Sequence, residues 1–175
     1  MPAEQGNSRN RIKAARLTRY ALFCAICLIV GYIESLLPLS FIAPGVKIGF
    51  SNAVALSLLL SGDPKGAFAV NVARILLSAL LFGSPFSLVF SLAGGVASLF
   101  AALMFKRVKA MSEIGVSMVS GSVHNLVQLT VASFVTGKGV IYYLPVLLIS
   151  GALTGAFVGY LTRLLVKKLK TNGVF

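Results

Sequence analysis

"IGVSMVSGSVHNLVQLTVASFV", residues 114–135, contains no charged residue, yet it carries the only histidine of the chain, His124. Asn125 follows this histidine directly, and Gln128 comes four residues after it. A helix of about 20 apolar residues crosses the ~30 Å hydrocarbon core of a bilayer, and this stretch is long enough to do so. It therefore predicts a membrane-spanning helix with three polar side chains near its middle.

The composition of the whole chain supports a membrane protein. The 175 residues are 57% hydrophobic and 11% charged, whereas about 25% of the residues of a soluble domain are charged. A soluble fold of this length could not hide so much apolar surface. We expect an all-α integral membrane protein with a six-helix membrane domain at 20–166, preceded by a basic segment at 1–19 and followed by a basic tail at 167–175.

Turn sequences such as "GDPKG" (62–66) and "GSP" (83–85) separate the apolar runs, because proline and glycine end helices. The six expected spans are Tyr20–Leu37, Val46–Ser61, Gly66–Phe82, Phe86–Phe105, Ile114–Val135 and Ile141–Val166. The second and third are short for a crossing, so we expect them to be tilted or partly buried in protein.

The basic residues are distributed unevenly over this arrangement. With six crossings, one side holds 13 of the 16 lysines and arginines, and the positive-inside rule makes that side cytoplasmic. They are Arg9, Arg11, Lys13, Arg16, Arg19, Lys65, Lys106, Arg107, Lys109, Arg163, Lys167, Lys168 and Lys170. We therefore expect a multi-pass protein of the bacterial cytoplasmic membrane with both termini in the cytoplasm. Basic tails beside anionic lipid account for the net charge of +12 without a nucleic-acid partner.

Several polar residues lie where they are costly, since a charged side chain in mid-membrane costs about 2.5–3.5 kcal/mol on insertion scales. One interpretation is structural: polar pairs join helices at about 0.6 kcal/mol each, and Glu34 with Arg74 would form a plain ion pair. The other is a pocket, open to the outer side, for an anionic or mixed polar and apolar ligand. Its candidate residues are Glu34, Lys47, Asn52, Asn71, Arg74, His124, Asn125 and Gln128.

Within this pocket we expect Arg74 to anchor the anion, because a guanidinium can bind a carboxylate or phosphate with two hydrogen bonds. His124 and Asn52 would orient the ligand. Asn71 precedes Arg74 by three residues, and His124 precedes Gln128 by four, so each pair shares one face of its helix. Asn125 lies about 100° away from His124 and is expected to reach a neighbouring helix.

Small residues recur at a spacing of four in two of the expected spans. Gly151, Gly155 and Gly159 are spaced so that another helix can approach closely, and we expect internal packing there. Ala21 and Ala25 have the same spacing in the first span. Cys24 and Cys27 also lie in this span, and we expect them to be buried filler, as free cysteines usually are.

The residues do not support catalysis by this chain alone. There is no phosphate-binding loop of the Walker A type, and no histidine, cysteine or acidic residues have the spacing of a metal site. The four acidic residues are scattered, whereas magnesium-dependent binding of diphosphate needs clustered carboxylates. An intramembrane serine protease using His124 is conceivable, but no nucleophile motif flanks any serine. We expect no cofactor.

Five stretches resemble the small bacterial membrane proteins called Gx transporters, a family often labelled heptaprenyl diphosphate synthase component I. They are "GYIESLLP" (31–38), "PGVKIGFSN" (44–52), "GDPKGAFAVNVARILLSALLFGSPFSLVFSLAGGVASL" (62–99), "GVSMVSGSVHNLVQL" (115–129) and "IYYLPVLLISGALTG" (141–155). This family in turn resembles the substrate-binding S components of energy-coupling-factor transporters. Those have six helices and cytoplasmic termini, and they pair with a transmembrane T component and two ATPases from other chains.

The resemblance implies a solute-binding membrane subunit of a bacterial transporter, for a small anionic ligand or one like an isoprenoid or quinone precursor. Ala21 and Ala25 match the alanine strip with which S components meet the T component. The alternative is a non-catalytic membrane component of a heptaprenyl diphosphate synthase complex. A third possibility is a passive structural protein. Ligand identity does not follow from the residues.

Overall fold

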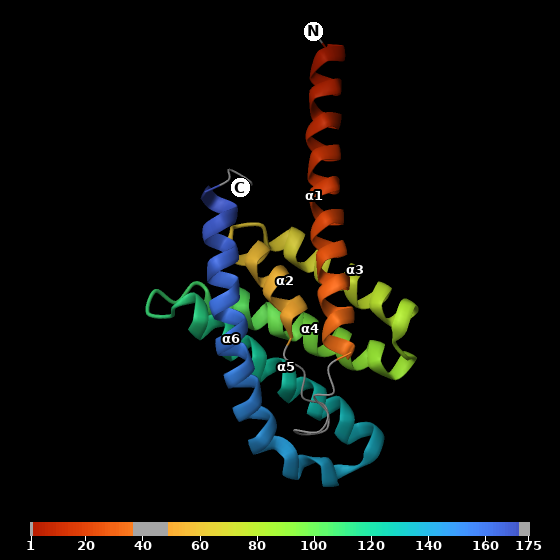
Figure 1. The fold of residues 1–175 in the computed structure, drawn as a ribbon, viewed down its shortest axis with the longest axis vertical. Coiled ribbons are helices and arrows are strands. Elements are labelled where there is room, and N and C mark those ends of the chain that lie inside the picture. The colour runs from red at the N-terminus through yellow and green to blue at the C-terminus, as the bar shows by residue number, and fades with distance from the viewer. Residues whose placement is uncertain (1, 37–48, 172–175) are drawn as a thin grey trace.

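The computed structural model describes residues 2–36 and 49–171, which fold into six α-helices and one 3-10 helix (Figure 1). These are α1 (Pro2–Leu36), α2 (Phe50–Leu60), α3 (Pro64–Phe82), α4 (Pro85–Phe105), α5 (Glu113–Thr136), the 3-10 helix η2 (Lys138–Tyr143) and α6 (Leu144–Thr171). The described part of the chain contains no β-strand. The expected all-α class is therefore confirmed.

The helices begin where the sequence supplies caps. Asp63 precedes α3, and its carboxylate accepts a hydrogen bond from the amide of Gly66 at 2.9 Å. Ser84 precedes α4, and its hydroxyl accepts from the amide of Ser87 at 3.2 Å. A proline follows each cap at the first helical position, where its missing N–H costs nothing. The two expected turn sequences therefore do end one helix and start the next.

Four segments are long and apolar enough to cross a membrane: Asn10–Leu36, Pro64–Phe82, Pro85–Phe105 and Gly139–Thr171. The chain is thus a multi-pass membrane protein, but length and composition support four of the six expected crossings. Helix α2 has only 11 residues. Helix α5 has 24 residues and is not one of the four, because its serines and the amide and imidazole groups near its middle lower its hydropathy.

Helix α1 is longer than the expected first span. It starts at Pro2 and contains 35 residues, about 52 Å at 1.5 Å per residue, which exceeds the ~30 Å hydrocarbon core. Its N-terminal half projects from the rest of the bundle (Figure 1). The segment expected to be separate from the first span is thus helical and continuous with it. The sequence of this segment is rich in arginine and alanine, both good helix formers.

The short helix α2 lies inside the protein. It contacts α1, α3, α4 and α6, and the side chains of Leu58 and Leu59 are fully buried. They form the core together with Cys24 and Cys27 of α1 and Val70 of α3. Both cysteines are buried and free, as expected. Because protein surrounds α2 on most sides, it does not need the length of a lipid-exposed span.

Glycines allow α5 and α6 to pack with their backbones almost in contact. A Cβ atom added to Gly121 would lie 2.4 Å from the carbonyl oxygen of Gly151, and one added to Gly155 would lie 2.7 Å from that of Ser117. At Gly159, it would lie 2.8 Å from the Cα atom of Ile114. The glycine strip of α6 therefore serves packing within the molecule, which confirms that expectation.

Candidate ligand-binding site

A cavity of about 420 Å³ lies within the bundle, and all six α-helices contribute residues to its wall. Seven of the eight predicted site residues border it: Glu34, Asn52, Asn71, Arg74, His124, Asn125 and Gln128. The eighth, Lys47, lies outside the described residues. The structure thus brings together polar residues from α1, α2, α3 and α5 that are far apart in the sequence.

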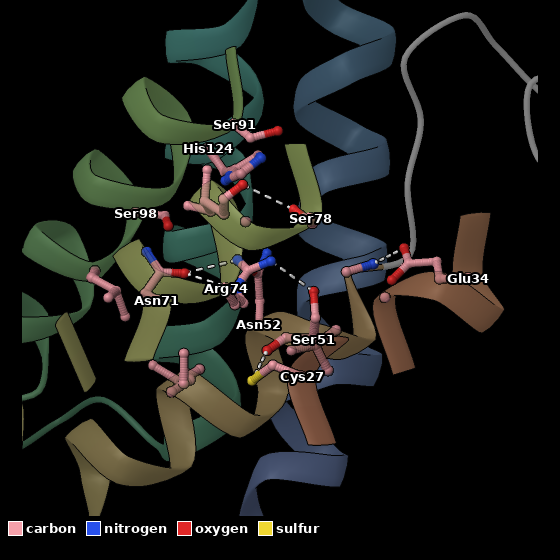
Figure 2. Close-up of a pocket in the computed structure, with 18 of the residues that line it drawn as sticks. Cys27, Glu34, Ser51, Asn52, Asn71, Arg74, Ser78, Ser91, Ser98 and His124 are labelled. Carbon is pink, nitrogen blue, oxygen red and sulfur yellow. Dashed lines mark hydrogen bonds between the residues drawn. The ribbon is translucent and has the colours of Figure 1, made fainter. Parts of the chain in front are cut away.

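Arg74 is central to the polar part of the cavity (Figure 2). Its Nε donates to Oδ1 of Asn71 at 3.0 Å, and its Nη2 donates to the same oxygen at 2.8 Å. Its Nη1 donates to Oγ of Ser51 at 2.9 Å, and its Nη2 also donates to Oδ1 of Asn52. Every one of these acceptors is neutral, although the guanidinium carries a full positive charge.

Glu34 also has a role that neither interpretation of the sequence predicted. Its carboxylate accepts hydrogen bonds from the backbone amides of Gly49 and Phe50, the latter at 3.0 Å, and so it caps the start of α2 (Figure 2). The unpaired amides and the positive end of the dipole at a helix N-terminus favour a carboxylate there. The direct ion pair with Arg74, one of the two interpretations, is therefore not formed. Glu34 reaches the cavity as part of its wall.

His124 and Gln128 fit against a glycine of α4. A Cβ atom added to Gly94 would lie 3.1 Å from Cε1 of His124 and 3.0 Å from Cγ of Gln128. The adjacent Gly95 gives similar room to Asn71, whose Nδ2 would lie 3.1 Å from an added Cβ. The two glycines of α4 therefore create the space in which polar side chains of α3 and α5 reach the cavity.

Two asparagines differ in how their side-chain amides are satisfied. Asn125 donates through Nδ2 to the carbonyl oxygen of Leu147 at 2.8 Å, so it joins α5 to α6, a neighbouring helix as predicted. Asn71 is 1% exposed, and its Nδ2 has no hydrogen-bond partner among the described residues. A buried amide N–H without a partner costs about 1–3 kcal/mol. Asn71 therefore uses its oxygen to hold Arg74 and keeps a buried, unsatisfied N–H in the wall of the cavity.

Serine hydroxyls make up much of the remaining polar wall, and the sequence interpretation missed them. They are Ser35, Ser51, Ser78, Ser87, Ser91, Ser98, Ser117 and Ser120. Helical spacing was a usable signal for several of them: Ser78 lies four residues after Arg74, and Ser117 lies seven before His124, which places each pair on one face. For Ser51, the only signal in the sequence was its position next to Asn52. Its contact with Arg74 joins α2 to α3, and spacing within one helix does not predict such a contact.

The family model described as heptaprenyl diphosphate synthase component I matches residues 23–165. The match extends from the first turns of the apolar part of α1 to the last turns of α6 and includes every residue of the cavity wall. It confirms the family resemblance noted in the sequence. No curated protein and no solved structure matches the chain.

Proposed function

The chain belongs to the heptaprenyl diphosphate synthase component I family, and from this we propose that it is a non-catalytic membrane component of such a synthase complex. We propose further that it holds a small anionic ligand in the cavity around Arg74. The family description names a component and not a complete enzyme, which agrees with the expectation that this chain does not catalyse alone. It also implies a partner subunit that carries the catalytic acids.

The observation that carries the proposal is the set of neutral partners around Arg74. Removing a charged group from water costs several kcal/mol unless an opposite charge or good hydrogen bonds compensate. The three side chains that accept hydrogen bonds from Arg74, those of Ser51, Asn52 and Asn71, are all neutral, and Glu34 of the same wall is not hydrogen-bonded to it. A carboxylate or phosphate in the cavity would give Arg74 a charged hydrogen-bond acceptor, and charge-assisted bonds to a guanidinium are about twice as strong as neutral ones.

The rest of the wall favours a ligand that is anionic at one end and partly apolar. Leu56, Ile75, Leu99 and Val158 border the same cavity as the polar residues. Its volume of about 420 Å³ lies in the range of small-molecule pockets, roughly 300–1,000 Å³. A short isoprenoid diphosphate combines these features, with its diphosphate at Arg74 and its hydrocarbon part against these four apolar side chains.

The proposed role is tested by reconstitution with a partner enzyme. The full chain in lipid vesicles is mixed with the soluble prenyl transferase that co-purifies with it, and turnover of a short prenyl diphosphate is measured with and without the chain. We expect faster formation of long-chain product in the presence of the wild type, and less with the Arg74→Gln variant. Equal turnover with and without the wild type would overturn the role in synthesis.

A second candidate function is a solute-binding transport subunit with the arrangement of an S component. The side chains of Ala21 and Ala25 are exposed on α1, and the neighbouring Leu22 and Ile26 are 61% and 47% exposed. This surface is available to a transmembrane partner. Co-purification of a T component and two ATPases, in place of a soluble prenyl transferase, would establish this second candidate and overturn the first.

A further inference from the structure

A second groove opens on the outside of the bundle, and it shares no residue with the cavity around Arg74. It has a volume of about 820 Å³ and lies between α1 and α6, with α2 as its floor. Figure 1 shows α1 and α6 on either side of α2. The groove is lined by Ile26, Val30, Phe50, Ala53, Val54, Leu161, Leu164, Leu165, Lys167, Lys168 and Thr171.

We propose that this groove binds an anionic phospholipid of the bilayer. Its polar lining residues, Lys167, Lys168 and Thr171, all come from the last turns of α6, whereas its other eight lining residues are apolar. A phospholipid has the same division, with an anionic phosphate at one end and an acyl chain behind it. Basic pockets between membrane helices are known to bind acidic lipid head groups.

The lysines lie at one end of the apolar part of the groove on α6. From Leu161 to Lys167, α6 rises by about 9 Å at 1.5 Å per residue, which fits within the ~15 Å that one leaflet contributes to the ~30 Å hydrocarbon core. Lys167 and Lys168 follow this apolar stretch. An acyl chain whose head group lies at the lysines would therefore run along the groove toward mid-membrane.

The apolar part of the groove faces hydrocarbon. Ile26 is 47% exposed and Leu164 is 46% exposed, and the neighbouring Leu22 and Ile29 are each 61% exposed. Apolar side chains this exposed on a membrane helix contact lipid tails, because burial in protein does not cover them. A chain from the adjacent leaflet is thus the occupant already present at this surface.

The floor of the groove is held in place by contacts between α2 and α6. The rings of Phe50 and Phe157 pack edge to face with centroids 5.7 Å apart, and Oγ1 of Thr162 lies 3.4 Å from the carbonyl oxygen of Ala53. The groove is therefore formed before a lipid enters it, which reduces the entropy that binding would cost.

Charge selects the head group. Lys167 and Lys168 are exposed, and no acidic residue is among the described residues that line the groove. The C-terminal end of a helix carries about half of one negative charge, so the two full positive charges of the lysines outweigh it. Their long apolar stems can lie along the groove while the ammonium groups stay at the membrane surface.

The test is native mass spectrometry of the full chain, in detergent, with equal amounts of phosphatidylglycerol and phosphatidylcholine that have the same acyl chains. We expect the wild type to bind phosphatidylglycerol in preference to phosphatidylcholine. In the double variant Lys167→Gln/Lys168→Gln, the ratio of bound phosphatidylglycerol to bound phosphatidylcholine should fall about tenfold or more. Each basic residue near an anionic lipid strengthens binding by about 1 kcal/mol, which is about fivefold in affinity. The matched control Arg107→Gln/Lys109→Gln removes the same charge from exposed positions between α4 and α5 and should keep the preference.

Three results would overturn the proposal. One is equal binding of the two lipids to the wild type, and another is an equal loss in the control and the lysine variant. The third is displacement of phosphatidylglycerol by an equimolar prenyl diphosphate, which would make the occupant a prenyl lipid. An Ile26→Trp variant, which fills the groove at a half-exposed position, should bind less phosphatidylglycerol but keep the ligand affinity of the Arg74 cavity, so this test is independent of the proposed function.

Discussion

At the scale of single residues, the positive charge of Arg74 and the negative charge of Glu34 are stabilised by different hydrogen-bond partners. Arg74 is bound by neutral oxygens of Ser51, Asn52 and Asn71, whereas Glu34 is bound by two backbone amides at the start of α2. A direct pair between them would neutralise both charges and leave none for a ligand. Their separation leaves Arg74 without a carboxylate among its hydrogen-bond partners, as the proposed anion site requires.

Changing Glu34 to glutamine tests this separation. The variant keeps one oxygen acceptor for the amides of Gly49 and Phe50 but removes the charge, and a hydrogen bond to a charged group contributes about 1.5–3 kcal/mol against about 0.5–1.5 for a neutral one. We expect the free energy of unfolding to fall by about 1 kcal/mol, which is measured as a lower unfolding temperature in detergent. The ligand affinity should stay the same. Loss of affinity at unchanged unfolding temperature would instead place Glu34 in contact with the ligand.

At the scale of helices, the sequence predicts most where a local signal exists. The proline and glycine turns at 62–66 and 83–85 and the apolar runs after them allowed the starts and ends of α3 and α4 to be predicted within two residues. The projecting part of α1 gave no apolar signal, and the 3-10 helix before α6 gave no clear one. In the site, spacing predicted which residues share a helical face. It did not predict contacts between helices, such as Ser51 with Arg74 or Glu34 with the start of α2, because these depend on tertiary packing.

The packing of α5 on α6 depends on a small residue at position 155. We expect Gly155→Ala to lower the unfolding temperature strongly, because the added Cβ would lie 2.7 Å from a backbone oxygen of Ser117 and backbone atoms cannot move aside easily. Overpacking of this kind typically costs about 1–3 kcal/mol. The measurement is thermal unfolding of the purified chain in detergent.

Leu153→Ala provides the control on the same helix, because Leu153 is 67% exposed and its truncation leaves no internal cavity. A change within about 0.5 kcal/mol is expected there. If the two variants unfolded at the same temperature, the close packing of α5 on α6 would not require a glycine at position 155.

The partner surface on α1 is tested at the same scale. Ala21→Trp should leave folding and ligand affinity unchanged, since Ala21 is exposed and a larger side chain meets only lipid there. It should prevent association if a second transmembrane chain packs on this strip. The measurement is co-purification of partner chains from membranes, and recovery of the same partners with the variant would remove Ala21 from any interface.

At the scale of the whole molecule, residues predicted to lie on one side of the membrane do gather at one end of the bundle. Oη of Tyr20 donates to Oδ2 of Asp63 at 2.6 Å, and Nζ of Lys106 donates to the carbonyl oxygen of Leu59 at 2.7 Å. Burial, and then the charges of Arg107 and Lys170, lower the pKa of Lys106. The end of α2, the start of α3 and the end of α4 thus lie at one end of the bundle, and Tyr20 in the middle of α1 contacts the start of α3 there.

The side of the membrane is tested by cysteine labelling in intact cells. A cysteine at position 138 should react with a membrane-impermeant maleimide added outside, and one at position 107 should not, because the basic end is expected to face the cytoplasm. The two native cysteines are buried and give the background. The reverse labelling pattern would invert the orientation.

The central claim is that the cavity around Arg74 binds an anion, and the most direct measurement is the affinity of the purified chain for farnesyl diphosphate by calorimetry. The Arg74→Gln variant keeps hydrogen-bond donors for Asn71 and Ser51 but lacks the charge, so it should bind about tenfold to a hundredfold more weakly than the wild type. Arg163→Gln, a control at an exposed position of α6, should bind as tightly as the wild type. Equal affinity of the wild type and a correctly folded Arg74→Gln variant would contradict the account.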